Sequence, residues 1–274
     1  MNAGEPRTVQ AGNAGLFALS GTRTIIVGRR KVAVVDPGPD DREHREALLG
    51  RLQEAEEGVI LLTHRHPDHA AGAPALARAT GFPVRGGDSR GGVEPLAAGE
   101  RIVTDGGTLE VVPTPGHASD HLAFLLRPHR ILLSGDMLLG QGSTTWVGEY
   151  AGCVADYLES LDRIEALEPR RIIPGHGPDL TDPGDAVQRF RAHRLDRIRQ
   201  VREALDHGVG APRPASDEGL EALVDRVYGP ELPPGLREGA RWSVRAILEY
   251  LGAAPFPSTG APTEGGEGLL APGS

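Results

Sequence analysis

The sequence predicts an α/β fold of layered sheets and helices, followed by a small helical region. Two observations predict it. In the first two thirds of the chain, short runs rich in β-branched residues and leucine alternate with helix-like patterns and glycine-rich turns. From about Asp185 onward, apolar residues recur at helical spacing. With 274 residues, 39% of them hydrophobic, the chain is long enough to bury one large core and a small appended region.

Short apolar runs bounded by turn residues predict the strands of the layered part. They are residues 24–27, 32–35, 59–63, 109–113, 122–126, 131–134 and 171–173. Helical patterns between these runs predict helices at residues 42–55, 67–79 and 154–167. The sequence Asp105-Gly106-Gly107 indicates a tight hairpin before Leu109.

The carboxyl-terminal third is expected to contain a long helix and two shorter ones. An apolar stripe defines the long helix: Val187, Phe190, Ile198, Val201 and Leu205. Many arginines cover the rest of its surface, and prolines separate it from the shorter helices. These arginines suit either phosphate binding or simple solvation, and we favour solvation.

Four segments follow from this organisation. We expect a flexible amino terminus at residues 1–14, an α/β domain at 15–184, a helical domain at 185–252 and a disordered tail at 253–274. The tail is rich in proline and glycine and cannot bury enough apolar surface to order itself.

Composition limits the functional classes. The net charge of −9 argues against a protein dedicated to coating nucleic acid. The single cysteine, Cys153, excludes an intramolecular disulfide framework. The amino terminus resembles no signal peptide, and no run approaches the ~20 apolar residues of a membrane span. We therefore expect a cytoplasmic protein with no membrane contact.

The stretch THRHPDH at residues 63–69 follows the apolar run at 58–62 directly. It places His64, His66, Asp68 and His69 within one turn at a strand end. Metal ions in proteins are held by imidazole and carboxylate side chains on rigid element ends, and such a density is rarely structural. The stretch therefore predicts a metal site.

Three later strand ends each add one more donor directly after a glycine. The donors are His117, Asp136 and His176. A glycine before a ligand allows a sharp turn and a close approach of the side chain to a small ion. Each donor alone would be a weak signal, but together with THRHPDH they predict one shared metal site.

This run of HxHxDH followed by separate His, Asp and His residues resembles the metallo-β-lactamase superfamily over about residues 15–180. The resemblance implies an αββα sandwich with all ligands at one edge of two facing sheets. It implies two Zn²⁺ ions, with Mn²⁺ or Fe²⁺ as alternatives. His64, His66 and His117 would hold the first ion, and Asp68, His69 and His176 the second. Asp136 would bridge them.

The implied reaction is hydrolysis by a water whose pKa the two ions lower toward ~7, with Asp68 and Asp136 as the catalytic carboxylates. The bridging Asp136 argues against antibiotic hydrolysis, because true β-lactamases of the superfamily lack this bridge. About 40 residues separate Asp136 from His176. That spacing is too short for the domain inserted in the large RNA-processing nucleases of this superfamily.

Three classes within the superfamily remain: thioesterases similar to glyoxalase II, persulfide dioxygenases that use one iron, and a branch of single-stranded RNA endonucleases. The last branch includes a mitochondrial enzyme with a winged-helix-like carboxyl-terminal region. The chain resembles it through TPGHASDHLAF, SGDMLLGQGSTTW, IIPGHGPDL and the helical region, over about residues 15–252. The basic β-wing of that branch has no counterpart after Gly252. Single-stranded RNA is the favoured substrate and a small thioester the alternative, and no obligate protein partner is evident.

Four further residues carry weaker signals. Asp36 ends an expected strand and is expected either to support a metal-ligating imidazole or to form a turn before Pro37. His121 is expected to lie behind the metal ligands. Ser143 and Thr144, in a hydroxyl-rich loop, would hold a substrate oxygen or form an ordinary loop. The remaining histidines are expected at the surface: His44, His129, His193 and His207.

Overall fold

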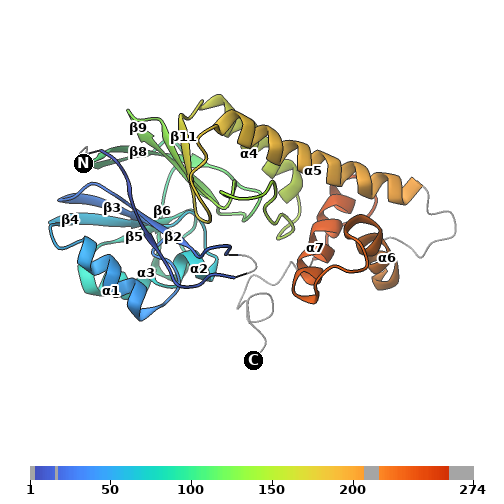
Figure 1. Cartoon of the computed structure of the whole chain (residues 1–274), viewed down its shortest axis with the longest axis horizontal. Coiled ribbons are helices and arrows are strands. Elements are labelled where there is room, and N and C mark those ends of the chain that lie inside the picture. The colour runs from blue at the N-terminus through green and yellow to red at the C-terminus, as the bar shows by residue number, and fades with distance from the viewer. Residues whose placement is uncertain (1–3, 16–17, 207–215, 259–274) are drawn as a thin grey trace.

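Two β-sheets face each other in this computed structural model, which describes residues 4–15, 18–206 and 216–258 (Figure 1). The first sheet has the order β1-β2-β3-β4-β5-β6. Its strands are β1 (Arg7–Gln10), β2 (Arg23–Val27), β3 (Lys31–Val35), β4 (Glu57–Leu61), β5 (Val84–Gly86) and β6 (Glu94–Pro95). The second sheet has the order β11-β10-β9-β8-β7. Its strands are β7 (Arg101–Thr104), β8 (Gly107–Pro113), β9 (Leu122–Arg127), β10 (Ile131–Gly135) and β11 (Arg171–Pro174).

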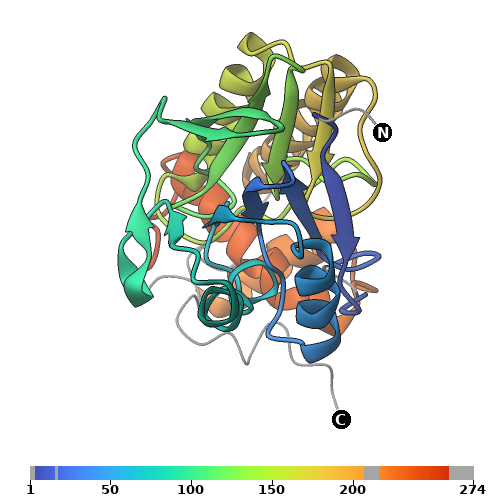
Figure 2. The same ribbon diagram turned by 90° about the vertical axis from the view of Figure 1, so that its left-hand side faces the viewer.

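Helices cover the outer face of each sheet, as the view in Figure 2 shows. The first sheet carries α1 (Arg42–Arg51), α2 (Pro67–Ala70) and α3 (Ala73–Thr80). The second carries α4 (Cys153–Ala166) and the start of α5 (Pro183–Asp206). A short 3-10 turn, η1 (Arg90–Gly92), lies between β5 and β6. The fold is therefore the αββα sandwich expected from the sequence.

Side-chain alternation along the strands explains the layers. In β2, Ile25 packs between the two sheets while Ile26 packs against α1 and α3. In β9, Phe124 packs between the sheets while Leu125 joins the cluster under α4 and α5. Both faces of these central strands are buried, which is why their sequences read as continuous apolar runs.

Strand direction brings the predicted ligands to one edge. β3 pairs with β4 in parallel, and β10 pairs with β11 in parallel. β8 runs in the same direction as β10, because both are antiparallel to β9. The carboxyl ends of these strands therefore share one edge of the sandwich, and the sheets join there through the hydrogen bond from Leu122 N to Thr63 O.

The predicted strands and the predicted hairpin are present, with ends shifted by one or two residues. Two predicted helices differ more. The helix expected at 42–55 ends at Arg51, because residues 53–56 turn back and Glu56 N donates to Arg30 O. The helix expected at 67–79 is broken into α2 and α3. Pro74 has no N–H to continue the ladder, and Gly72 N donates instead to Gly38 O of a neighbouring loop.

The expectation of a flexible segment at 1–14 is wrong for residues 7–10. They form β1, which pairs antiparallel with β2, and half-buried Val9 packs against the cluster beneath the first sheet. The first residues of the expected disordered tail also pack against the rest of the protein. Phe256 packs on Trp242 with ring centroids 5.8 Å apart, whereas residues 259–274 lie outside the described part of the chain.

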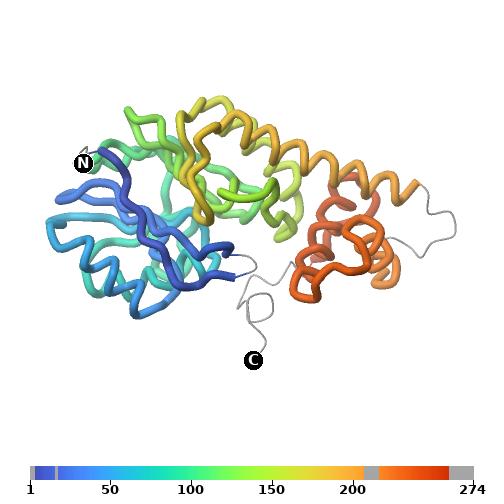
Figure 3. Tube along the Cα trace, in the orientation of Figure 1, coloured from blue at the N-terminus to red at the C-terminus, as the bar shows by residue number. Residues whose placement is uncertain are grey.

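The helical region extends from the sandwich along α5, as Figure 3 shows. It continues with α6 (Asp217–Tyr228) and α7 (Pro234–Tyr250). Residues 216–258 contain these two helices and no strand, so this stretch contains no β-wing. One hydrophobic cluster joins α4, α5, α6 and α7 with β9, β10 and β11. Among the described residues, no helix is both long and apolar enough to cross a membrane.

Candidate metal centre

Three imidazoles converge to form the first group of ligands. His66 Nδ1 lies 3.1 Å from His64 Nε2 and 2.9 Å from His117 Nε2. His64 and His66 follow β4, and His117 follows β8, so both sheets contribute. The group has the spacing of a metal site, because one ion can contact nitrogens that lie this close together.

A second group consists of Asp68, His69 and His176. His69 Nε2 lies 3.1 Å from His176 Nε2, and Asp68 Oδ2 lies 3.2 Å from His176 Nε2 and 3.5 Å from His69 Nε2. Asp68 and His69 belong to α2, while His176 follows β11. This group too combines ligands from both halves of the sandwich.

Asp136 lies between the two groups. Its Oδ2 is 3.8 Å from His117 Nε2 and 3.5 Å from His176 Nε2. Its Oδ1 is 3.3 Å from His69 Nε2 and is buried with no hydrogen-bond partner among the described residues. A buried carboxylate oxygen without a donor is costly, and a bound cation would compensate it.

Contacts behind the imidazoles favour metal binding. His117 Nδ1 donates to Trp146 O at 2.8 Å, and His176 Nδ1 donates to Gly21 O at 3.2 Å. Carbonyl oxygens only accept, so in the neutral rings Nε2 has no hydrogen and offers its lone pair inward. His69 Nδ1 in the same way faces Asp36 Oδ2 at 2.9 Å. In the neutral rings the inward nitrogens of His69 and His176 therefore face each other as two acceptors, an arrangement that suits a divalent cation.

The two groups differ in electrostatics. Burial and the His69 imidazole hold the pKa of His64 well below its usual range, and burial and the His117 imidazole lower that of His66 to about 3. In the second group, burial opposes protonation, but Asp136 and Asp68 raise the pKa of His176 to about 10. The first group thus offers neutral imidazoles, while the carboxylates of the second group favour a positive charge beside them, either a proton on His176 or a metal ion that would replace it.

Close packing explains the glycines before the ligands. A Cβ atom on Gly175 would lie 2.7 Å from His69 Cε1 and 2.8 Å from Asp136 Oδ1. Gly135 has φ +49°, and a Cβ atom there would lie 2.7 Å from both His121 Nε2 and Thr63 Oγ1. The ligands reach one another because these two positions have no side chain.

A sequence profile described as the Metallo-beta-lactamase superfamily matches residues 18–95 and 85–176, more than half of the chain. The chain belongs to this superfamily. It is accordingly a metal-dependent hydrolase, and its His/Asp cluster is the metal centre typical of the superfamily.

Relatives agree with this assignment. The Beta-lactamase-like protein 2 homolog of Caenorhabditis elegans is 34% identical over 206 residues, which cover 70% of this chain and 68% of that protein. The Atrochrysone carboxyl ACP thioesterase of Aspergillus fumigatus is 32% identical over 240 residues, covering 82% of this chain and 74% of that protein. The crystal structure of a metallo-beta-lactamase family protein from Thermus thermophilus has the same fold, with TM-score 0.73 and 24% identity over 90% of this chain and 92% of that chain.

Asp36 and His121 lie directly behind the superfamily ligands. Asp36 accepts from Thr63 N at 2.8 Å and from Thr63 Oγ1 at 2.7 Å, in addition to its contact with His69. His121 Nε2 accepts from Asp136 N at 3.2 Å, and its Nδ1 lies 2.9 Å from Thr114 Oγ1. Both residues are buried, and each links a ligand to the end of a strand.

The hydroxyl-rich loop contacts the metal centre through Thr145, and not through Ser143 or Thr144, the two residues singled out in the sequence. Thr144 is exposed and donates to Thr145 O at 3.2 Å, and Ser143 is half-buried. Thr145 is buried, and its Oγ1 lies 3.4 Å from His117 Nδ1. Ser143 and Thr144 keep a substrate role only as a prediction.

Two further neighbours of the cluster were not among the residues singled out in the sequence. The centroid of the Trp146 ring lies 6.3 Å from the centroid of the His66 ring and 6.2 Å from that of the His117 ring. Glu149 Oε1 lies 4.0 Å from His66 Nε2, and burial together with Asp120 raises the pKa of Glu149 to about 7. Trp146 ends the stretch SGDMLLGQGSTTW, which also contains Asp136, so that stretch could have pointed to it, whereas Glu149 lies outside every motif quoted from the sequence.

The expectation of a surface position is wrong for His44. It is buried in α1, and its Nε2 lies 2.8 Å from Thr24 Oγ1, which also donates to Asp36 O. His44 therefore supports the strand end that carries Asp36. The sequence around His44 predicts a helix but does not show that this face of the helix packs against the strand end at Thr24 and Asp36.

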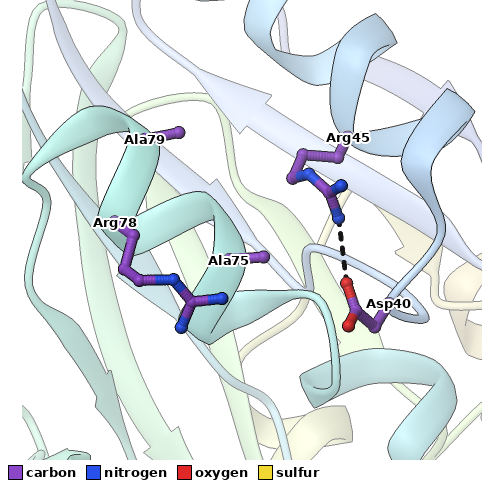
Figure 4. A pocket seen from close by; sticks show the side chains of 5 residues that line it. All are labelled: Asp40, Arg45, Ala75, Arg78 and Ala79. Carbon is purple, nitrogen blue, oxygen red and sulfur yellow. Dashed lines mark hydrogen bonds and ion pairs between the residues drawn. The ribbon is translucent and has the colours of Figure 1, made fainter.

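A separate open pocket of about 410 Å³ lies between α1 and α3 (Figure 4). Its lining consists of Asp40, Arg45, Ala75, Arg78 and Ala79. Arg45 Nη1 is paired with Asp40 Oδ1 at 2.9 Å. None of these residues belongs to the ligand groups, so the chemistry is assigned to the His/Asp cluster.

Proposed function

We propose that this chain hydrolyses acyl thioesters with two divalent cations. The observation that carries the proposal is the position of Asp136 between the two ligand groups. One carboxylate facing both groups suits a pair of ions held close together. Cations held there would polarise the substrate carbonyl and make an attacking water more acidic.

The residues of the chain would position the reactants and move the proton. Asp68 is partly exposed, and His69 and His176 overcome the effect of its burial and lower its pKa to about 2, so it is ionised. In the proposed reaction, the water oxygen bonds to the carbonyl carbon and the carbon–sulfur bond breaks. The proton lost by the water passes through Asp68 to the departing thiolate, which leaves as a thiol.

Two observations support a thioester substrate. The relative from Aspergillus fumigatus is named a carboxyl ACP thioesterase. Arginines of the long helix, for which phosphate binding was the alternative to solvation, are already engaged: Arg191 pairs with Asp162 at 2.6 Å and Glu165 at 3.1 Å. Arg194 is buried. Ion-paired and buried arginines are poorly available for phosphate.

Single-stranded RNA is the second candidate substrate. The long arginine-bearing helix and the two helices after it are present, as the resemblance to the RNA endonuclease branch requires. Arg199, however, pairs with Glu203 at 2.7 Å and also contacts Asp196.

A persulfide dioxygenase would use one iron, whereas the two ligand groups favour two ions.

The deciding experiment compares three forms of the protein on two substrates. They are the Zn²⁺-loaded wild type, Asp136→Asn, and the exposed control Asp185→Asn. Each is incubated with a short acyl thioester, with thiol release as the readout, and with a labelled unstructured RNA. We expect thiol release by the wild type and the control, loss of at least about 100-fold in Asp136→Asn, and intact RNA.

Other outcomes separate the alternatives. Metal-dependent RNA cleavage without thioester turnover would replace the proposal with the RNA endonuclease. In that case, cleavage should weaken steeply as salt rises. Purified protein holding one iron and no second metal would favour the dioxygenase.

A further inference from the structure

The loop at residues 144–152 contacts the metal centre on one side and the carboxyl-terminal helices on the other. We call it the brace loop. Toward the centre, Trp146 O accepts from His117 Nδ1 at 2.8 Å, and Thr145 Oγ1 lies 3.4 Å from the same nitrogen. The orientation of His117 therefore depends on where the brace loop holds these two residues.

The helices hold the brace loop on both sides of that contact. Arg194 of α5 donates to Thr145 O at 3.0 Å, and Ser243 of α7 donates to Val147 O at 3.0 Å. The Trp146 indole donates to Gly239 O, also in α7, at 3.0 Å. The carbonyls that flank Trp146 O thus face the helices, while Trp146 O itself faces the metal ligand.

Arg194 is an unusual residue for this position. It is 3% exposed, it lies over the Tyr157 ring at 5.4 Å, and its Nε has no hydrogen-bond partner among the described residues. Among the described residues, no carboxylate lies within ion-pair distance of the Arg194 guanidinium. Burying a guanidinium without a counter-ion is costly, and an apolar residue would pack two helices together better. Its hydrogen bond to Thr145 O is the contact that an apolar residue could not supply.

We propose that Arg194 and Ser243 are positioning residues for His117, so that the carboxyl-terminal helices set the affinity of the first ligand group for its cation. The inference rests on the two-cation site of the proposed function but not on its substrate. Groups that orient a metal ligand from behind typically contribute about 10–100-fold to metal affinity. Within the described chain, the second group of Asp68, His69 and His176 makes no hydrogen bond or ion pair with Arg194 or Ser243, so its affinity should not change.

Competition with a chromophoric chelator tests this by measuring stepwise Zn²⁺ affinities without substrate. Arg194→Met keeps most of the side-chain length and removes the donor. The matched control is Arg197→Met on the same helix, because Arg197 also donates to a backbone carbonyl, Val227 O, and lies over an aromatic ring, that of Tyr228 at 4.4 Å. We expect Arg194→Met to weaken one of the two steps about 10–100-fold, and Arg197→Met to weaken neither.

Reference variants identify the affected step. His117→Ala should remove the step that Arg194→Met weakens, and His176→Ala should remove the other. Arg194→Lys, which keeps a donor, should recover part of the affinity. If Arg194→Met does not fold, Ser243→Ala carries the test with the same expectation.

Unchanged affinities in both the Arg194 and Ser243 variants, or an equal loss in Arg197→Met, would overturn the inference. A wild type that binds only one Zn²⁺ would instead contradict the two-cation proposal. Absorption of the Co²⁺-loaded variants gives an independent readout, because a reoriented His117 changes the spectrum while a purely structural defect leaves it intact.

Discussion

Single residues without side chains allow the ligands of this centre to meet. Gly175→Ala would place a methyl group 2.7 Å from His69 and 2.8 Å from Asp136. We expect this variant to lose at least one of two bound metals, as measured by metal analysis after gel filtration. The control Gly50→Ala, in α1, has open space around its Cβ position and should keep both metals. Full metal content in Gly175→Ala would contradict the close packing described for the cluster.

Cys153 illustrates a residue whose chemistry is suppressed by its place in the fold. It is fully buried at the start of α4, and burial raises the pKa of its thiol to about 11. Only the thiolate reacts with alkylating reagents, so we expect no labelling of the folded protein by iodoacetamide at about pH 8 and complete labelling in denaturant. Mass spectrometry measures both. Rapid labelling of the folded chain would show that the thiol is accessible.

At the scale of elements, β1 is expected to contribute to stability although its sequence suggested a flexible end. Val9 faces the cluster beneath the first sheet, while its neighbour Thr8 is exposed. Val9→Asp should therefore lower the free energy of unfolding by about 1–3 kcal/mol, because it buries a charge. Thr8→Asp should change it by less than about 0.5 kcal/mol. Urea unfolding of the two variants is the measurement, and equal effects would mean that β1 does not pack.

Across the whole molecule, the metal centre connects the two sheets. His64 and His69 come from the first half of the sandwich, while His117, Asp136 and His176 follow strands of the second sheet. Ions bound here stabilise only the folded state, so removing them with a chelator should lower the melting temperature. Restoring Zn²⁺ should reverse the shift in the wild type and restore less of it in Asp136→Asn. An unchanged melting temperature after complete removal would contradict this connection.

The ligands and the layered fold were accessible from the sequence because both depend on local patterns. THRHPDH, the glycine before each later donor and the continuous apolar runs of β2, β3 and β9 are all local features. The structure confirmed the fold class and brought all seven predicted ligands together. Helix and strand ends were less predictable, because contacts from other elements, such as Gly38 O at Gly72, decide where they end.

The sequence by itself determined which residues could bind metal and that they follow strand ends. Only the tertiary structure decided what holds them. Thr24, His44 and Arg194 lie outside every ligand motif and act through contacts that no motif records. Trp146 holds His117 through its backbone carbonyl, a contact that the sequence does not reveal either. The physical reason is that a ligand needs a chemical type, which a short pattern reveals. Its orientation instead depends on hydrogen bonds and packing between segments that only the folded chain brings together.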